Sequence, residues 1–320
     1  MKSPANPYFY GPTLDDVMRS VTERILDSGN PVVATKGSTV EIAGVLLEIK
    51  DPRARLSRTE SRGKPFSCLG ELCWYLAGSG DLAFISYYLS KYEESADDGS
   101  LFGAYGPRLF DWDGANQVQN VISHLQRKAT TRQAVIQIFD RGDIVGDHKD
   151  VACTCTLQFM IREDALHLIA SMRSNDAYWG MPHDIFCFTM LQEIIASELS
   201  IALGSYKHAV GSLHIYDDRI DAARQFVDEG WQSTLTPMPP MPSGSQWPAV
   251  TLLLEAEATI REKGTVDPGV LAKLDPYWAD LVRLLQIFRL KKEKSTNGFH
   301  EIHNGFSSDV YDPFISSLYQ

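Results

Sequence analysis

Apolar and polar residues alternate most regularly between positions 150 and 185 of the chain. Two alternating runs, residues 157–161 and 166–171, predict β-strands, and the polar residues 162–164 between them predict a hairpin turn. A turn follows at residues 180–182, and an apolar run with helical spacing begins at Ile185. The pattern therefore predicts two paired strands and a buried helix, joined by a short polar segment.

The pattern of apolar, polar and turn-forming residues also predicts the other elements of the chain. Residues 237–248 are rich in Pro, Gly and Ser and predict an irregular, exposed connection. We expect a core over residues 1–234 and a mainly helical elaboration over residues 235–320, packed on the same domain, whose role the sequence does not give. Helices are expected at 13–27, 66–77, 217–229, 249–263 and 277–294, a strand at 134–139, and a loop entering a strand at 32–42.

Composition narrows the class of protein. The 320 residues include 30 basic and 41 acidic side chains, and the net charge of −11 argues against nucleic acid as a general partner. The chain has no long uncharged apolar run and no basic-then-apolar leader, which predicts a soluble cytoplasmic protein without membrane contact. Five cysteines, an odd number in a long chain, do not suggest a disulfide framework.

The polar segment after the second strand carries reactive groups. Arg173, Ser174 and Asp176 supply a guanidinium, a hydroxyl and a carboxylate, and a second carboxylate follows at Asp184. Cys153 stands before the first strand, at the edge of its apolar run. A thiol, an anion-binding cluster and a carboxylate in one short stretch indicate a functional site.

A further carboxylate, Glu71, interrupts the otherwise apolar helix expected at 66–77. A buried charge must be paired or used, because burying it alone is costly. An ordinary ion-pair arrangement with the charged neighbours Lys64 and Asp81 is the structural alternative. The cysteines on either side of Glu71 have a spacing that suits no metal set, so we expect core thiols and no metal.

Several ordered motifs together resemble the thymidylate synthase superfamily. They are a cysteine followed by Gln-Phe, an Arg-Ser-x-Asp sequence, a Gly-x-Pro turn and a His-x-Tyr sequence, here at Cys153 with 158–159, 173–176, 180–182 and 214–216. Two details are similar to the cytidylate hydroxymethylase branch: Thr154 follows the cysteine, and Asp184 stands at the position that reads the base. The resemblance fades after residue 230.

The resemblance implies a fold, a pair of substrates and a reaction. The implied fold is α+β, a large twisted mixed β-sheet flanked by helices, with two such sheets stacked back to back in a homodimer. The implied substrates are a pyrimidine nucleoside monophosphate and, as co-substrate, 5,10-methylenetetrahydrofolate. The thiolate adds to C6 of the base, C5 takes the one-carbon unit, and water then gives a 5-hydroxymethyl product and tetrahydrofolate.

The resemblance also implies a role for each matching side chain. The expected catalytic residues are Cys153, Glu71, Tyr105 and Asp184. The nucleotide phosphate is expected to bind Arg173, Ser174, Lys36 and Arg132, of which Arg132 reaches the partner subunit's phosphate site. The ribose is expected to contact His214 and Tyr216, which share one strand face, and the folate is expected to contact Asp176.

The choice of nucleophile depends on the resemblance. Cys155 shares the expected strand face with Cys153, so spacing alone does not separate the two thiols. The match of motifs selects Cys153, and Arg173 nearby is expected to favour its thiolate form.

Asp184 determines the base that we expect. Cytosine presents its exocyclic amine as a donor, which suits an acceptor-only carboxylate, whereas uracil presents O4 as an acceptor that a carboxylate repels. CMP or dCMP is therefore the expected substrate, and the small Ala177 after Asp176 leaves room for a ribose 2′-hydroxyl and favours CMP. The structural alternative is that Asp184 caps the N-terminus of the following helix.

Two features favour addition of water over hydride transfer to the intermediate. Residues 92–100 lack the tryptophans that thymidylate synthases place near the folate, and the C-terminal sequence SSLYQ differs from the apolar tail that seals those enzymes against water. The alternatives are a thymidylate synthase that methylates dUMP and an inactive nucleotide-binding regulatory protein. The family's CMP hydroxymethylases serve nucleoside-antibiotic biosynthesis, so a role of that kind is implied.

Overall fold

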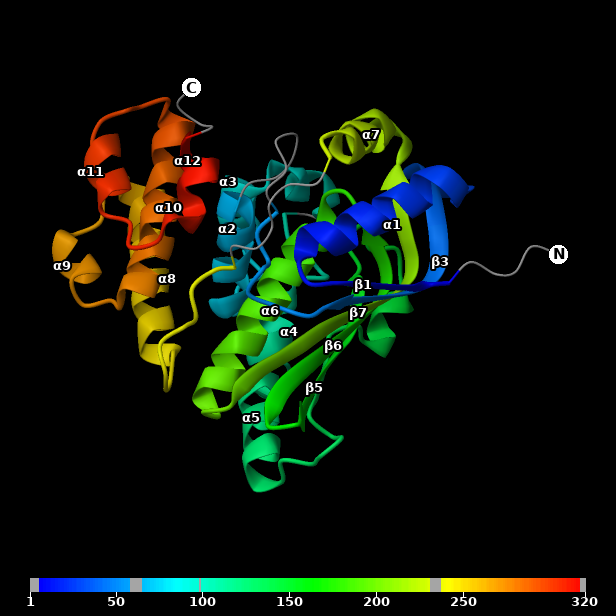
Figure 1. Ribbon diagram of the computed structural model, residues 1–320, viewed down its shortest axis with the longest axis horizontal. Coiled ribbons are helices and arrows are strands. Elements are labelled where there is room, and N and C mark those ends of the chain that lie inside the picture. The colour runs from blue at the N-terminus through cyan, green and yellow to red at the C-terminus, as the bar shows by residue number, and fades with distance from the viewer. Residues whose placement is uncertain (1–5, 58–64, 98, 231–236, 317–320) are drawn as a thin grey trace.

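The computed structural model describes residues 6–57, 65–97, 99–230 and 237–316. A seven-stranded sheet lies at its centre, with the order β1-β3-β7-β6-β5-β4 and with β2 paired to β3 (Figure 1). β1 runs parallel to β3 and β6 runs parallel to β7, whereas the other pairs are antiparallel. The strands are β1 (Tyr8–Gly11), β2 (Asn30–Ala34), β3 (Gly37–Ile49), β4 (Val135–Gln137), β5 (Thr154–Arg162), β6 (Ala165–Asp176) and β7 (Ala202–Tyr216).

Helices flank this mixed sheet, and the expected α+β class is confirmed. They are α1 (Leu14–Ser28), α2 (Pro65–Leu76), α3 (Leu82–Tyr88), α4 (Tyr105–Phe110), α5 (Gln117–Arg127), α6 (Gly180–Glu198) and α7 (Ile220–Asp228). α6 packs on β6 and β7, and α2 packs on α6, α3 and α4. α1 packs on β1, β3 and α7. The stacking of two sheets in a homodimer stays a prediction.

The alternation of side chains along the strands explains where the core lies. In β6, Leu166, Leu168, Ala170 and Met172 are buried, and the residues between them are half-buried. β7 repeats this pattern with Tyr206, His208 and Val210 buried. Because side chains of a strand point alternately to the two faces, one face of the sheet carries the core and the other is less covered.

The helix α6 begins earlier than the sequence predicted. Residues 180–182 were expected to form a turn and the helix to start at Ile185, but α6 starts at Gly180 and contains Pro182 in its first turn. Proline fits there because the first N–H groups of a helix have no intrahelical acceptor. Asp184 therefore lies inside the helix, and the alternative that it is an N-cap is wrong.

Other differences from the expected elements follow from weak sequence signals. The strand expected at 134–139 is only three residues long, and the loop expected near residue 32 is a hairpin of β2 and β3 whose tip contains Lys36. Most of β7 was not predicted, because Gly204, Lys207, His208 and Gly211 interrupt its apolar alternation. Gly211 allows close strand packing, since a Cβ there would lie 2.8 Å from the Arg173 carbonyl oxygen.

The chain after residue 237 forms a second group of helices. They are α8 (Trp247–Lys263), α9 (Pro268–Leu271), α10 (Pro276–Glu293), α11 (Phe299–Asn304) and α12 (Asp312–Ser316). Figure 1 shows this group in yellow to red beside α2 and α3. α8 and α10 pack against each other and both contact α2. The two long helices agree with those expected at 249–263 and 277–294.

Short 3-10 helices connect several of these elements: η1 (Ser90–Ser95), η2 (Arg141–Ile144), η3 (Asp217–Arg219) and η4 (Asp309–Tyr311). The helix expected at 217–229 is thus η3 followed by α7. No helix in the described part of the chain is long and apolar enough to cross a membrane.

Candidate active site

One large pocket gathers most of the residues that the sequence singled out. Its volume is about 1090 Å³, and it opens between the β2–β3 hairpin, α2, the start of α6, the ends of β6 and β7, and α10. Ten predicted site residues line it: Lys36, Glu71, Tyr105, Cys153, Arg173, Ser174, Asp176, Asp184, His214 and Tyr216. Arg132 and Ala177 do not line it.

Cys153 lies at the pocket wall immediately before β5. Its Sγ is 3.7 Å from Arg173 Nη2 and 3.9 Å from the Val151 carbonyl oxygen. Arg173 lowers the pKa of the Cys153 thiol, as expected, but burial raises it by more, so that the net shift is upward. Burial thus favours the protonated thiol.

A β-bulge separates the two cysteines that spacing alone could not. The register of β5 on β6 shifts between Thr154 and Thr156, so that the side-chain alternation changes phase there. Thr154 is fully buried on the core side, and Cys153 faces the pocket while Cys155 does not line it. Of the two thiols only Cys153 lines the pocket, and its role as the nucleophile stays a prediction.

Arg173 and Lys36 bring two cations to one part of the pocket. Arg173 donates from Nε to the Ala152 carbonyl at 2.9 Å and from Nη2 to the Val151 carbonyl at 2.8 Å. Lys36, at the hairpin tip, donates to Ser95 Oγ at 3.3 Å. Both side chains are exposed, as a site for a solvated phosphate requires.

Glu71 is buried in α2 and is held by phenols. Its Oε1 accepts hydrogen bonds from Tyr92 Oη at 2.7 Å and from Tyr75 Oη at 3.0 Å. Burial and the Glu71 carboxylate raise the pKa of both tyrosines, which keeps the phenols protonated as donors. Asp81, an alternative neighbour, instead caps α3 through the Ala83 N–H, and Lys64 lies outside the described residues.

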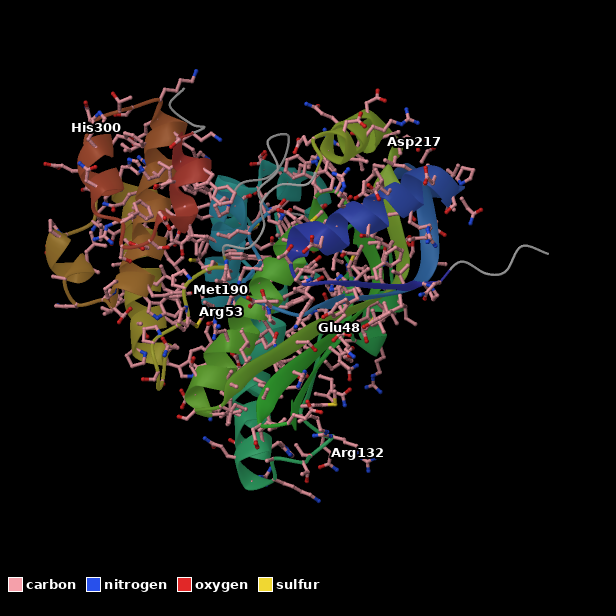
Figure 2. All side chains as sticks on the ribbon, viewed as in Figure 1. Glu48, Arg53, Arg132, Met190, Asp217 and His300 are labelled. Carbon is pink, nitrogen blue, oxygen red and sulfur yellow. The ribbon has the colours of Figure 1, made fainter. Side chains whose placement is uncertain are left out.

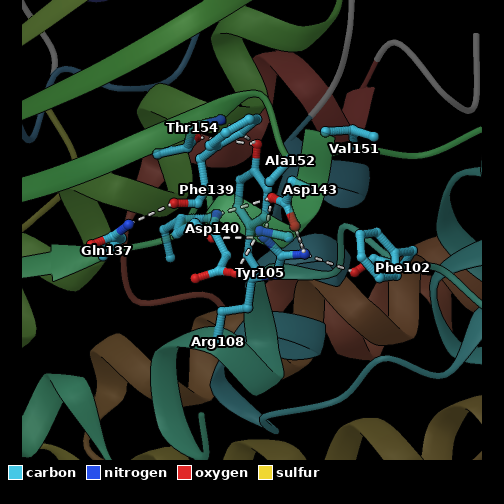
Figure 3. Close-up of polar contacts among 12 residues, drawn as sticks. Phe102, Tyr105, Arg108, Gln137, Phe139, Asp140, Asp143, Val151, Ala152 and Thr154 are labelled. Carbon is cyan, nitrogen blue, oxygen red and sulfur yellow. Dashed lines mark hydrogen bonds and ion pairs between the residues drawn. The ribbon is translucent and has the colours of Figure 1, made fainter. Parts of the chain in front are cut away.

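Tyr105 begins α4 and points at the strand that follows the cysteine. Its hydroxyl oxygen accepts from the Thr154 N–H at 3.0 Å and contacts Thr154 Oγ1 at 3.1 Å (Figure 3). Arg108 fixes the same helix, because its guanidinium donates to Asp143 Oδ1 at 2.8 Å and to the Phe102 carbonyl at 3.0 Å. The phenol is therefore placed by both its own bonds and a buried ion pair.

Asp184 is buried in the first turns of α6 and faces the pocket. Its Oδ2 accepts from Asn175 Nδ2 at 2.7 Å, and Oδ1 has no hydrogen-bond partner among the described residues. Burial, and then the nearby Glu71 carboxylate, raise the pKa of Asp184 to about 8. The group therefore holds a proton at neutral pH and presents one oxygen to the pocket.

His214 and Tyr216 end β7 with both rings at the pocket, 5.0 Å apart in a T-shaped contact. Ala177 is fully buried behind them, and its N–H donates to the His214 carbonyl at 2.8 Å. Any effect of Ala177 on the sugar thus passes through its neighbours, and its proposed role stays a prediction.

The side of the pocket expected for the folate is aromatic. Asp176 lies there with its Oδ1 accepting from the Tyr178 N–H at 2.9 Å. The 92–100 segment lacks tryptophan, yet Trp74 from α2 and Trp179 before α6 line the pocket. α10 adds Phe288, whose ring stacks on Tyr88 with centroids 5.1 Å apart.

Arg132 lies apart from the pocket. Figure 2 shows it beside α5 at the far end of the sheet, where its side chain is exposed. Its carbonyl oxygen accepts from Gln158 Nε2 at 3.2 Å. The expected contact with a partner subunit's phosphate stays a prediction.

Comparison with known proteins identifies the family to which this chain belongs. The family model described as "Thymidylate synthase" matches residues 20–239. The chain belongs to the thymidylate synthase family. The sequence motifs thus identified the superfamily correctly, and the seven-stranded sheet is a thymidylate synthase-like fold.

Two curated relatives in this family are named for a hydroxymethyl transfer. A deoxyuridylate hydroxymethyltransferase of Bacillus phage SP01 is 31% identical over 226 residues, which cover 66% of this chain and 59% of the relative. A deoxyuridylate hydroxymethyltransferase of Delftia phage PhiW-14 is 29% identical over 234 residues, covering 68% of this chain and 64% of the relative. The match therefore spans less than two thirds of each relative.

The thymidylate synthase match does not include α8–α12, although α10 contributes Phe288 and Lys291 to the pocket. Sequence reasoning missed these two residues, and also Glu41, Asp150 and Ser212 on the pocket wall. Ser212 donates to Glu41 there across the β3–β7 pair. Only the pairing of distant strands and helices brings these residues together, so no local signal could have found them. Within the described residues, no group of three His, Cys, Asp or Glu side chains could hold a metal ion.

Proposed function

We propose that this protein transfers a one-carbon unit from 5,10-methylenetetrahydrofolate to C5 of a pyrimidine nucleoside monophosphate and yields the 5-hydroxymethyl nucleotide, with cytidylate as the preferred substrate. Membership of the thymidylate synthase family supports the class of reaction. The names of both relatives support hydroxymethyl transfer in particular. The pocket supports it chemically, because a thiol, two buried carboxyl groups and two cations share one cavity.

Cys153 begins the reaction by adding to C6, which makes C5 nucleophilic. Arg173 at 3.7 Å stabilises the thiolate as it forms, and the raised thiol pKa means that substrate binding must accompany deprotonation. The folate supplies the one-carbon unit. Glu71 and its two phenols form a hydrogen-bonded group at the base. Tyr105 relays the C5 proton once the carbon–carbon bond has formed: its oxygen receives that proton while its own hydroxyl proton passes to solvent.

The last step is the addition of water. After tetrahydrofolate leaves, C5 carries an exocyclic methylene group, and water adds to it as Cys153 leaves C6. The water oxygen bonds to the former methylene carbon and gives up one proton to solvent. The π electrons of the methylene double bond form C5=C6, and the C6–S electron pair leaves with the Cys153 thiolate. Glu71 and Asp184 make one part of the pocket wall polar, and polar groups of this kind can hold the water that adds to the methylene carbon.

The observation that carries the choice of cytosine is the environment of Asp184. Its Oδ2 accepts from Asn175, which leaves Oδ1 for a ligand in the pocket that Asp184 lines. A carboxyl group with one proton complements the acceptor N3 and the donor amine of cytosine, and passing that proton to N3 leaves a carboxylate beside two N–H donors. Cytosine is therefore matched in either protonation state of Asp184.

The second candidate is deoxyuridylate, because both relatives are named for it. A protonated Asp184 would donate to uracil O4, and the raised pKa of about 8 makes that form available at neutral pH. Uracil is unmatched once Asp184 is ionised, because the carboxylate then faces O4. Turnover of a uracil nucleotide should consequently fall as the pH rises above 8, whereas turnover of a cytosine nucleotide should not.

The test is an assay of the full chain with 5,10-methylenetetrahydrofolate and CMP, dCMP, UMP or dUMP in turn, with Cys153→Ala as control. A product heavier by one CH₂O, formed fastest from CMP, supports the proposal, including the preference for ribose attributed to Ala177. A CH₂ gain on dUMP with dihydrofolate would instead identify a thymidylate synthase. Binding of nucleotide without any product would identify a regulatory protein.

A further inference from the structure

A chain of four buried polar side chains runs from the pocket into the interior beneath β7. Asn175 Nδ2 donates to Asp184 Oδ2 at 2.7 Å, and Asn175 Oδ1 is 2.9 Å from His208 Nε2. The other ring nitrogen, His208 Nδ1, is 2.7 Å from Tyr206 Oη. Tyr206 and His208 are completely buried, and neither lines the pocket.

We propose that Tyr206 and His208 are positioning residues that fix the orientation of the Asn175 amide, and thereby determine which oxygen of Asp184 accepts a hydrogen bond internally and which one reads the base. This inference rests on the proposed function for the identity of the base. The hydrogen bonds among these four side chains do not depend on the proposed function.

The direction of the hydrogen bonds follows from the chemistry of each group. Asn175 Oδ1 is only an acceptor, so His208 Nε2 must carry the hydrogen. Burial lowers the pKa of His208 to about 3, so the ring is neutral and Nδ1 is an acceptor. Tyr206 Oη then donates to Nδ1, and every donor in the chain points towards Asp184.

This direction has a consequence for Asp184. Donation from Asn175 Nδ2 favours Oδ2 as the acceptor oxygen and leaves a proton on Oδ1, the oxygen that remains for a ligand in the pocket. If the amide were reversed, its carbonyl would face Asp184 and would draw the proton to Oδ2. The base would then meet an acceptor instead of a donor, and N3 of cytosine would lose its partner.

The surroundings leave little freedom for other arrangements. A Cβ at Gly180 would lie 3.3 Å from Asn175 Nδ2 and 3.9 Å from Asp184 Oδ2, so this glycine keeps the contact open. Tyr206 and His208 are at i and i+2 of β7 and therefore point to the same face. The two rings also contact each other, with centroids 5.8 Å apart.

The first test compares Tyr206→Phe with the wild type. The change removes one hydroxyl and leaves the ring, so both His208 tautomers become available and the amide is free to reverse. We expect the ratio of kcat/KM for CMP to that for the corresponding uracil nucleotide to fall by about 5- to 10-fold, the effect of losing one buried hydrogen bond. The control is Tyr277→Phe, which removes another buried hydroxyl, bonded to Met190 Sδ at 3.4 Å outside the pocket. An unchanged ratio in Tyr206→Phe, or an equal fall in the control, overturns the proposal.

A pair of substitutions at His208 separates positioning from packing. His208→Gln keeps a donor near the position of Nε2 and should retain most of the base preference, whereas His208→Leu removes it and should lose the preference. Equal ratios in the two variants would contradict the proposal. Where a variant turns over poorly, the ratio of dissociation constants for CMP and UMP, measured by calorimetry on folded protein, gives the same readout.

A spectroscopic measurement tests the direction of these hydrogen bonds independently of the reaction. Nitrogen NMR of the histidine rings in the ligand-free protein should show His208 neutral, with hydrogen on Nε2, and Tyr206→Phe should give a mixture of tautomers. Hydrogen on Nδ1 in the wild type would overturn the inference even if cytidylate is the substrate. If His208 carries its hydrogen on Nε2 but the protein turns over no nucleotide, the inferred direction of the hydrogen bonds is supported and the proposed function is rejected.

Discussion

Two regions of this molecule bury carboxylates in opposite ways. In the C-terminal helices, Asp280 is fully buried and accepts hydrogen bonds from the N–H groups of Ser307 and Ser308, from Ser307 Oγ at 2.7 Å and from Arg283 at 2.9 Å. In the family-matched part, Asp184 is buried with a single bond to Asn175. The pKa of Asp184 is raised to about 8, which a buried carboxyl group shows when it lacks compensating donors.

The contrast shows how burial serves structure in one place and chemistry in another. A carboxylate with a full set of donors is stable as an anion and ties segments together, as Asp280 ties α10 to the turn before η4. A carboxyl group left with an unused oxygen at a cavity is destabilised as an anion and is available for a ligand. The same logic separates Glu257, bonded to Tyr88 and Arg261, from the groups in the pocket.

The largest expected effect is at the pocket nucleophile. Cys153→Ser should lower turnover by about 10⁴-fold or more, because a serine hydroxyl is a far weaker nucleophile without an adjacent base. Nucleotide affinity should change little, since the cations and Asp184 remain. Single-turnover product analysis together with calorimetric titration of CMP checks both. Substantial activity in Cys153→Ser would move the nucleophile elsewhere, with Cys155→Ser as the matched control.

The next effect should be on stability and should arise in the C-terminal helices. Asp280→Ala leaves the donors of Ser307, Ser308 and Arg283 without their acceptor, which should lower the free energy of unfolding by about 3 kcal/mol. Urea denaturation monitored by tryptophan fluorescence measures this change. If Asp280→Ala unfolds at the wild-type midpoint, the network at Asp280 is not stabilising and the contrast between the two aspartates is lost.

Asp184→Asn should raise the free energy of unfolding, whereas Asp280→Ala should lower it. The folded-state pKa of about 8 lies above the unfolded value of 3.8, so the folded protein binds more protons between these pH values and loses stability as the pH rises through that window. Asn removes this loss, so the variant should be more stable than the wild type at pH 8, and the difference should shrink to almost nothing near pH 4. Glu71, His183 and Asp176 also face Asp184 and remain in both proteins.

Urea denaturation of the wild type and of Asp184→Asn at pH 5, 6.5 and 8 measures whether the variant has the higher free energy of unfolding and whether the difference grows with pH. A variant that is less stable at pH 8 would show that Asp184 is a satisfied anion like Asp280. The same variant should shift preference from cytosine towards uracil, because an amide matches both the donor and the acceptor of the uracil edge. An unchanged ratio of CMP to uracil nucleotide turnover would contradict the proposed base reading.

The smallest effect on kinetics should come from Lys291, the residue through which the C-terminal helix α10 adds a charge to the pocket. Lys291 lines the pocket from α10 and is exposed, so its charge is well screened. Lys291→Ala should raise KM for the anionic folate by about 2- to 3-fold and leave KM for the nucleotide unchanged, because one exposed charge contributes less than about 1 kcal/mol. Lys294→Ala, on the same helix end but not in the pocket, is the control. Steady-state kinetics at two salt concentrations would distinguish them.

The sequence predicted the site well where one local segment carries the signal. Glu71 stood out as a lone charge in an apolar helix, and the motifs from Cys153 to Asp184 indicated the family, which the match over residues 20–239 confirms. The predicted helices near α1, α2, α8 and α10 agree with the structure because each has a long run of helix-compatible residues. Thr13 and Asp275 also cap the starts of α1 and α10.

The remainder could not be predicted, because it depends on contacts between distant segments. Tyr206 and His208 lie in a strand that the sequence did not predict, and only the pairing of β7 with β6 places Asn175 beside them. The bulge near Thr154, which turns Cys155 away from the pocket, is a property of the β5–β6 pair and not of β5 alone. The raised thiol pKa of Cys153 likewise reflects burial that no linear pattern reveals.

The stack of Phe288 on Tyr88 has a consequence for the order in which the protein is completed. Tyr88 is held from both sides by later segments, through the Phe288 ring and through a 2.7 Å bond from its hydroxyl to Glu257. A nascent chain that has just passed residue 239 already contains all twelve site residues predicted from the sequence, yet it lacks this wall of the pocket. The pocket therefore gains this wall only when α8 and α10 have been synthesised and have packed against α2 and Tyr88.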